Sequence, residues 1–596
     1  YKSYLFNGLL CSQVLNCVPS ILQLILACVS RHLGHFTLEM PGERQFVLLL
    51  CFYLAAITDC ATIISSDDDL YELSIIHLND FHARFEETTP QSTACNNKTD
   101  CIGGIARVFT EVKRLQNERK NPIFLNAGDN FQGTLWYNIH RWNVTQYFLN
   151  KFKTDAVTLG NHEFDHKIEG VVPFMGSLDA PIIVCNIDDS EEPTFRGKYN
   201  KSIVLERDGR KIGVIGVILA TTNEIAATGH LHFLDEPSSV AREAERLVKE
   251  EGVNIVIVLS HCGLDVDKRI AAEGGKNIDV IVGGHSHTFM FTGPNPPGPD
   301  KPLDDYPAIV ENNGHKILIV QASAFTKYLG DIVVWFDAEG NVQKWKGEPI
   351  YVNHDIVPDP VILEELKPWA ESVHEAGSEL LGFSKVPLRR DICGIGECNI
   401  GSFVTDAYVH GVLVSEDLPV EEDAWIYAAI SFINAGGIRS DIPEGNLTYN
   451  DLVTAQPFEN TLDTMELLGK HLREVFEHAV SESWSEKEFV ARHMLQVSGV
   501  RVTFNITLPV GQRVLSLETL CRQCRIPKFE PVMPDKWYRM VVPSFIANGG
   551  DGFTMLVENR RNHRVGELDQ DALKRYITHK SPIVQGLDGR IVMYRS

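Results

Sequence analysis

The segment Thr158-Leu-Gly-Asn-His-Glu-Phe-Asp165 places an amide, an imidazole and two carboxylates directly after a short apolar run. The run Ala156 to Leu159 has the composition of a buried strand, and Gly160 allows a tight turn after it. Side chains of these kinds bind divalent cations. Because Asn and His also occur in ordinary turns, the segment predicts a site only if other parts of the chain supply partners.

Further segments repeat this arrangement of a short apolar strand followed by polar side chains. The additional strands are predicted at 73–78, 122–127, 255–259 and 278–282. Helical patterns at 104–120 and 240–250 alternate with them, which favours an α/β domain. The polar residues expected after all of these strands are Asp80, His82, Asp129, Asn161, His162, His261, His285 and His287.

Ligand sites in α/β sheets gather at the carboxyl ends of the strands, so we expect these side chains to meet. A single histidine among them would more often be structural. Together, carboxylates, an amide and imidazoles suit a pair of divalent cations of the zinc, manganese or magnesium type, with a shared Asp between them.

The length of 596 residues predicts more than one domain. We expect an α/β domain over 71–350, a linker helix over 358–380 and a second domain over 381–596. The formal net charge of -24 argues against nonspecific binding to nucleic acid or to an anionic membrane. It does not exclude an anionic small substrate, because local arginines and metal ions can outweigh the global charge.

The second domain contains two glycine-rich segments with polar residues, Asn434 to Arg439 and Asn548 to Phe553. Glycine pairs allow the backbone to approach a ligand closely. Two tight turns with exposed polar residues are the alternative.

The beginning of the chain has the pattern of an exported protein. Residues 40–61 have the order of charged, apolar and small residues of a signal peptide, and 1–39 are predicted to be upstream, non-mature sequence. An anchor formed by Val18 to Ser30 is the alternative. The chain ends without a hydrophobic tail, so we expect no lipid-linked membrane anchor.

Cysteines and glycosylation sequons also fit an oxidising, extracellular compartment. Local disulfides are predicted for Cys95 with Cys101, Cys393 with Cys398, and Cys521 with Cys524; zinc binding is the alternative for the last pair. Cys185 and Cys262 lie in apolar strands and are expected to be free and buried. Sequons occur at Asn97, Asn143, Asn200, Asn446 and Asn505.

These motifs resemble two known domain types. The first domain resembles the calcineurin-like metallophosphoesterases in its ordered motifs Asp80-Phe-His82, Gly128-Asp129, Gly160-Asn-His-Glu163, His261 and Gly284-His-Ser-His287. The second resembles the nucleotide-binding domain of the 5'-nucleotidase family, which includes secreted apyrases of blood-feeding arthropods, in Asn434-Ala-Gly-Gly-Ile-Arg439, Gln456-Pro-Phe458 and Ser544-Phe-Ile-Ala-Asn-Gly-Gly-Asp-Gly-Phe553. The resemblance implies a four-layer α/β metallophosphoesterase sandwich, joined by a linker helix to an α+β substrate-binding domain.

The resemblance also implies two divalent metal ions, which could be zinc, calcium, magnesium or manganese. One ion would be held by Asp80, His82, Asp129 and His287, and the other by Asp129, Asn161, His261 and His285. His162 and Asp165 match the catalytic pair of the family, in which a cationic His162 would stabilise charge on the transferred phosphoryl group. Glu163 is expected to support the loop without a direct catalytic role.

For the substrate, the resemblance implies contacts from both domains and a movement between them. Arg84 matches a position near the phosphate, and Asn434 and Arg439 would hold phosphate or ribose oxygens. Phe458 and Phe545 would stack on the base, and Asp551 would accept hydrogen bonds from the ribose.

One departure affects the expected substrate. Relatives that hydrolyse AMP carry an arginine directly after the first cysteine of the Cys-x-x-x-x-Cys loop, where this chain has Gly394 after Cys393. We therefore expect a secreted apyrase that hydrolyses ATP and ADP, which in a blood-feeding animal would suppress platelet activation. The alternatives are a 5'-nucleotidase that converts AMP to adenosine, and a catalytically inactive protein that binds nucleotides or host proteins.

Overall fold

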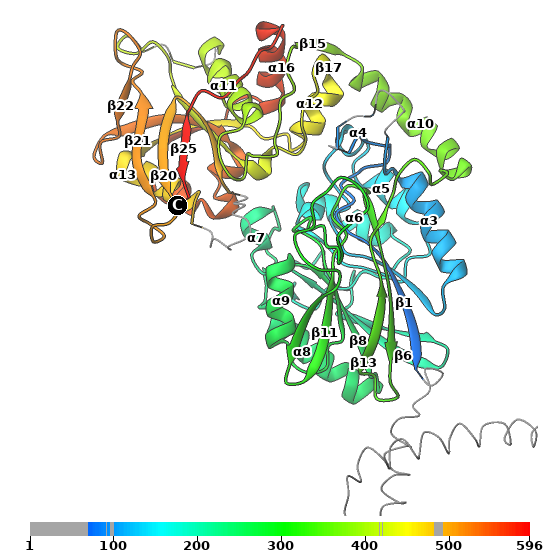
Figure 1. Ribbon diagram of the computed structural model, residues 1–596. Coiled ribbons are helices and arrows are strands. Elements are labelled where there is room, and N and C mark those ends of the chain that lie inside the picture. Colours follow the sequence, from blue (N-terminus) through cyan, green and yellow to red (C-terminus); the bar gives the residue numbers. More distant parts are fainter. Residues whose placement is uncertain are drawn as a thin grey trace, which may run out of the picture. The chain divides into compact units, whose positions relative to one another are not determined.

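The computed structural model describes residues 70–595, apart from 91, 94, 96–100, 416–417, 420 and 482–492. The predictions for residues 1–39, for the signal peptide at 40–61, for the alternative anchor and for the sequon at Asn97 lie outside the described residues. Within them, the chain forms a first domain of two large sheets and a second domain with sheets of its own (Figure 1).

The first sheet has the strand order β13-β12-β1-β2-β3, and β14 also pairs with β12. In β1, Leu73 and Ile75 point into the core between the two large sheets, whereas Ile76 and Leu78 point into a second core on the other face. The strands of this sheet are β1 (Tyr71–Leu78), β2 (Pro122–Asn126), β3 (Ala156–Val157), β12 (Tyr328–Phe336), β13 (Val342–Gly347) and β14 (Ile350–Tyr351).

The second sheet has the order β10-β11-β9-β8-β6-β5, with β6, β8, β9 and β11 parallel to their neighbours in that series. Its central strand β8 is completely buried, which explains its continuous apolar sequence. The strands are β5 (Ser202–Arg207), β6 (Arg210–Ile218), β8 (Ile255–His261), β9 (Val280–Val282), β10 (Ala308–Asn312) and β11 (His315–Val320), beside a small pair, β4 (Ile187–Asp188) and β7 (His232–Phe233).

Helices cover the outer faces of both sheets, which gives the predicted four-layer sandwich. In Figure 1, α3 lies next to β1 on one side of the first domain, and α8 and α9 lie on the other side of that domain. The helical segments are α3 (Ile105–Glu118), α4 (Leu135–His140), α5 (Trp142–Leu149), η2 (Asn161–Phe164), α6 (Lys167–Ser177), α7 (Thr222–Ile225), α8 (Glu236–Arg246), η3 (Leu247–Glu251) and α9 (Leu264–Glu273).

The helix α10 (Pro360–Gly377) connects the two domains. It begins after Asp359, whose side chain accepts hydrogen bonds from the N–H groups of Val361 and Ile362, an N-cap that stabilises the first turn. Its buried residues Ile362, Leu366, Ala370 and Val373 recur on one helical face. This face packs against α3 and α4 of the first domain and α12 of the second.

The second domain contains a five-stranded sheet, β19-β16-β23-β18-β24, and a four-stranded sheet, β22-β21-β20-β25. A short pair, β15 (Leu380–Ser384) and β17 (Gly445–Thr448), follows the linker. The remaining strands are β16 (Ile430–Asn434), β18 (Leu462–Leu468), β19 (Leu495–Ser498), β20 (Val500–Asn505), β21 (Val514–Leu520), β22 (Phe529–Pro531), β23 (Trp537–Pro543), β24 (Arg561–Arg564) and β25 (Ile591–Tyr594).

Helix α11 (Asn399–Val414) is mostly buried and packs against α16, β16 and β19. The other helical segments are η4 (Ala435–Gly437), α12 (Tyr449–Ala455), α13 (Gly469–His478), α14 (Ser544–Ala547), η5 (Gly550–Gly552), α15 (Thr554–Asn559) and α16 (Asp569–Lys580).

All three predicted disulfides are present, Cys95 with Cys101, Cys393 with Cys398, and Cys521 with Cys524. The last bond leaves no free thiol for the zinc alternative. Cys185 and Cys262 are free and buried, as predicted. Asn143, Asn200 and Asn446 are exposed and Asn505 is half-buried. No helix in the described part of the chain has both the length and the apolar composition to span a membrane.

Candidate active site

The predicted metal-binding side chains gather at one end of the two large sheets. Asp80 and His82 follow β1, Asp129 follows β2, Asn161 follows β3, and His285 and His287 follow β9. His261 differs slightly from the prediction, because it is the last residue of β8 and not a residue after it.

The side chains form two groups that share the carboxylate of Asp129. Within each group the candidate ligand atoms lie within 4.8 Å of one another. The first group is Asp80, His82, Asp129 and His287, and the second is Asp129, His261 and His285. Asn161 joins the second group, because its Oδ1 lies 2.8 Å from Nδ1 of His285. We call these residues together the metal cluster.

Two histidines of the metal cluster are oriented by hydrogen bonds to the backbone. Nδ1 of His82 donates to the carbonyl of Gln132 at 2.9 Å, and Nδ1 of His261 donates to the carbonyl of Ala127 at 2.6 Å. Each hydrogen bond fixes the tautomer and leaves Nε2 with its lone pair, as metal-binding imidazoles require. Nε2 of His261 is buried without a hydrogen-bond partner among the described residues, although it lies 3.1 Å from Asp129 Oδ2. The donor set therefore fits divalent cations.

The backbone of the cluster adopts a conformation that is uncommon for residues other than glycine. Asp80, His82, Asp129, His285 and His287 all have a positive φ, between 49° and 71°. Such residues cost free energy, of the order of 1 kcal/mol each, and persist where the surrounding structure enforces them, often at functional sites. The loop conformation directs these side chains into the two ligand groups.

Asp129 and the histidines around it shift one another's pKa values toward the charged forms. Burial lowers the pKa of His261, but the nearby carboxylate of Asp129 outweighs this and raises that pKa to about 9. Burial would raise the pKa of Asp129, yet His261 and His162 hold it well below its usual range. Asp129 is therefore a carboxylate, and a bound cation would displace the proton of His261.

His162 and Asp165 form the predicted pair beside the metal cluster. Nδ1 of His162 donates to Asp165 Oδ2 at 2.8 Å, and the backbone N–H of His162 donates to Asp129 Oδ1 at 2.9 Å. Although burial opposes it, the carboxylates of Asp165 and Asp129 raise the pKa of His162. This environment favours an imidazolium that points its second nitrogen away from Asp165.

Glu163 is completely buried and joins the two loops that carry Asp129 and Asn161. One carboxylate oxygen accepts from the N–H groups of Gly160 and Asp129, at 2.6 and 3.0 Å. The other accepts from Asn130 and Phe131, at 2.6 and 3.3 Å. The side chain thus holds the ligand loops together, which agrees with its expected supporting role.

The second domain brings several of its candidate residues to the same place. Nη2 of Arg439 lies 3.3 Å from His82 Nε2, and its guanidinium lies over the ring of Phe458. The ring of Phe458 stacks on that of His162, with centroids 5.6 Å apart. Asn434, the last residue of β16, donates to Asp551 Oδ2 at 2.6 Å. Phe545 lies on α14, and its stacking on a base opposite Phe458 stays a prediction.

Arg84 is buried behind the metal cluster. Its guanidinium lies over the ring of Phe325, 4.7 Å from the centroid, and Nη1 donates to the carbonyl of Gly133. Nε and Nη2 have no hydrogen-bond partner in the part of the chain that the structure describes. The ring of Phe325 also contacts those of His82 and His287. These two buried guanidinium nitrogens beside the rings are consistent with an anion near this position.

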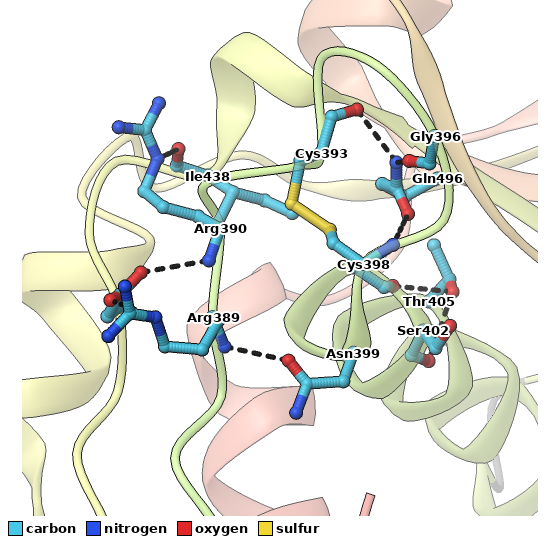
Figure 2. The surroundings of a disulfide bond; sticks show 12 residues. Arg389, Arg390, Cys393, Gly396, Cys398, Asn399, Ser402, Thr405, Ile438 and Gln496 are labelled. Carbon is cyan, nitrogen blue, oxygen red and sulfur yellow. Dashed lines mark hydrogen bonds and ion pairs between the residues drawn. A yellow bond between two sulfur atoms is a disulfide. The ribbon is translucent and has the colours of Figure 1, made fainter. Parts of the chain in front are cut away.

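Sequence reasoning missed Arg390, which lies beside Arg439. Nε of Arg390 donates to the carbonyl of Ile438 at 2.9 Å, and its backbone N–H donates to Asp441 at 2.8 Å. Figure 2 shows the loop between Arg390 and the Cys393–Cys398 disulfide, where Gln496 donates to the carbonyls of Cys393 and Gly396. The only signal in the sequence was the pair Arg389-Arg390 just before this loop.

The three arginines Arg84, Arg390 and Arg439 repel one another. Burial, together with Arg390, lowers the pKa of Arg439 to about 10, and burial with Arg439 and Arg390 lowers the pKa of Arg84 to about 9. Cations this close are stabilised by an anion with several oxygens, such as a phosphate chain. The site therefore combines a cluster of candidate metal ligands with three buried arginines whose mutual repulsion an anion would offset.

Two known domain families match successive parts of the chain. Calcineurin-like phosphoesterase matches residues 73–289, and 5'-nucleotidase, C-terminal domain, matches residues 380–558. Among solved structures, the chain is similar to a 5'-nucleotidase precursor from Thermus thermophilus, with a TM-score of 0.78 and 32% identity over 88% of this chain and 100% of that one.

The chain is also similar to an apyrase from Tabanus yao, with 51% identity over 92% of this chain and 98% of the relative. An apyrase from Aedes aegypti is 39% identical over 93% and 98%. A 5'-nucleotidase from Bos taurus is 37% identical over 87% and 91%.

Proposed function

Because this chain belongs to the 5'-nucleotidase family, we propose that it is a secreted, metal-dependent apyrase that removes terminal phosphates from extracellular ATP and ADP. The single observation that supports this most is the pair of ligand groups that share Asp129, with His162 and three arginines beside them. Carboxylates and imidazoles would hold two cations, and guanidiniums would bind the phosphate chain between the domains.

Asp80, His82, Asp129 and His287 would hold one divalent cation, and Asp129, Asn161, His261 and His285 the other. Bound there, the cations would activate a water and neutralise charge on the phosphate oxygens. His162, protonated and oriented by Asp165, would donate a hydrogen bond to the transferred phosphoryl group, where negative charge increases in the transition state. Arg439 and Arg390 would bind the remaining phosphates and orient the chain.

The proposed nucleoside site consists of Asn434, Phe458, Phe545 and Asp551. The aromatic rings would stack on the base, and Asp551 would accept from ribose hydroxyls. The disulfides and the exposed sequons support secretion. Removal of ADP in blood would suppress platelet aggregation.

A 5'-nucleotidase that converts AMP to adenosine is the second candidate, and Arg390 is the observation that favours it. Gly394 removes one guanidinium relative to AMP-hydrolysing relatives, but Arg390 supplies another one close to Arg439. The absence of an arginine at position 394 is therefore weaker evidence against hydrolysis of AMP than the sequence suggests.

Phosphate release by the purified full chain from ATP, ADP and AMP, with and without chelator, tests these candidates. We expect hydrolysis of ATP and ADP, complete loss with chelator, and recovery when zinc, calcium, magnesium or manganese is added back. Hydrolysis of AMP as fast as ADP would support the second candidate. Absence of hydrolysis with all added metals would support an inactive nucleotide-binding protein.

A further inference from the structure

The loop 548–553, which carries Asp551, is held in a strained conformation; we call it the nucleotide loop. Asp551 has φ 55° and ψ 28°, in the left-handed region, and Gly549 and Gly552 also have positive φ. Aspartate tolerates this conformation better than most residues with a side chain, but the conformation still costs free energy and persists where contacts hold it. The contacts that enforce it therefore determine where the carboxylate of Asp551 points.

Two side chains hold Asp551, one through its carboxylate and one through its backbone carbonyl. Asn434 donates to its carboxylate at 2.6 Å. His478, the last residue of α13, lies with Nε2 2.7 Å from its backbone carbonyl oxygen. Since a carbonyl can only accept, Nε2 of His478 must carry the proton and donate it. This hydrogen bond fixes the peptide group that sets the direction of the Asp551 side chain.

The ring of His478 is itself fixed by packing. It stacks on the ring of His493 with centroids 4.8 Å apart, and it meets the buried ring of Phe553 edge to face at 4.7 Å. A Cβ at position 552 would lie only 3.1 Å from this ring, so the glycine lets the loop backbone approach it. On the other side of the loop, a Cβ at position 550 would overlap the ring of Phe545. The loop is thus packed between His478 and Phe545.

We propose that His478 is a positioning residue for nucleoside binding, which acts by holding the nucleotide loop so that Asp551 and Phe545 face the ribose and the base. The inference rests on the proposed function in taking Asp551 and Phe545 as nucleoside contacts. His478 lies in the second domain, away from the metal cluster, so it affects binding of the nucleoside and leaves the phosphoryl chemistry unchanged.

Two amide variants of the full chain test this inference. The Nε2 of glutamine in His478→Gln lies at about the same distance from the backbone as Nε2 of histidine and can donate to Asp551, whereas the amide in His478→Asn is one methylene too short. We expect His478→Asn to weaken adenosine binding, measured by calorimetry, about fivefold, the usual effect of one hydrogen bond. The KM for ADP should rise by a similar factor with kcat unchanged, and His478→Gln should behave as the wild type.

A matched control is His471→Asn on the same helix. Nδ1 of His471 lies 2.8 Å from the carboxylate of Glu474, within the helix and not on the nucleotide loop, so this variant should bind adenosine normally. Equal adenosine affinity of His478→Asn and the wild type would overturn the inference, as would equal losses in the Gln and Asn variants. The adenosine measurement does not depend on turnover. If the wild type hydrolyses neither ATP nor ADP, the proposed function fails while the binding comparison still decides the role of His478.

Discussion

In the first domain, five of the seven candidate ligands have left-handed backbone just after a strand, whereas in the second domain the candidate substrate contacts are held in place by side-chain contacts and by a disulfide. The first arrangement brings Asp80 and His285 to either side of the shared Asp129 through the sheets themselves. The second depends on single contacts, such as those of Arg390 with Ile438 and of Asn434 with Asp551. We infer that the first domain determines the chemistry and that the second can change substrate preference with few substitutions.

The largest effect is expected for a substitution of His162, which lies beside the metal cluster. His162→Ala removes the donor to the phosphoryl group, and we expect kcat for ADP to fall about 10²- to 10⁴-fold. The metal content, measured by elemental analysis, should stay at the wild-type value because His162 is not a member of either ligand group. The surface variant His354→Ala is the control. Full activity of His162→Ala would refute the catalytic assignment.

An intermediate effect is expected for Glu163→Gln, which tests how the ligand loops are held. The amide can accept with only one of its two atoms, so its NH₂ group would face two of the four backbone N–H donors. We expect metal affinity, measured by titration of the metal-free protein, to fall about 10- to 100-fold. Glu169→Gln, on an exposed position of α6, should have no effect. Unchanged metal affinity would show that the loops do not need this carboxylate.

The smallest of these three effects is expected for Arg390→Ala, in the second domain. Loss of one charge-assisted contact should raise the KM for ADP about tenfold and leave metal affinity unchanged. The exposed Arg525→Ala serves as the control. A comparison of ADP with AMP sharpens the test, because a larger effect on AMP would mean that Arg390 replaces the guanidinium lost at Gly394. An unchanged KM for both substrates would remove Arg390 from the site.

The sequence predicts that the candidate metal ligands of the first domain come together, and it predicts the arrangement of the second domain's candidate contacts only in part. Each candidate ligand of the first domain lies at or just after the end of a short apolar strand, and parallel strands place their carboxyl ends together, so the meeting of Asp129 and His261 could be predicted without coordinates. Arg390 could not be placed in the site from the sequence, because no periodicity relates it to Arg439. The two come together only because the loop before Cys393 bonds to Ile438 and Asp441. The stacking of Phe458 on His162 likewise depends on contacts between the domains.

The left-handed backbone of Asp80, His82, Asp129, His285 and His287 also limits how this protein can evolve. Apart from glycine, the residues that best tolerate this conformation are asparagine, aspartate and histidine, and β-branched residues are the least tolerated. These tolerated residues are also oxygen and nitrogen ligands for divalent cations. Substitutions that the backbone accepts at these positions therefore tend to leave a metal ligand in place, so metal preference can drift among hard and borderline cations while the binuclear centre survives.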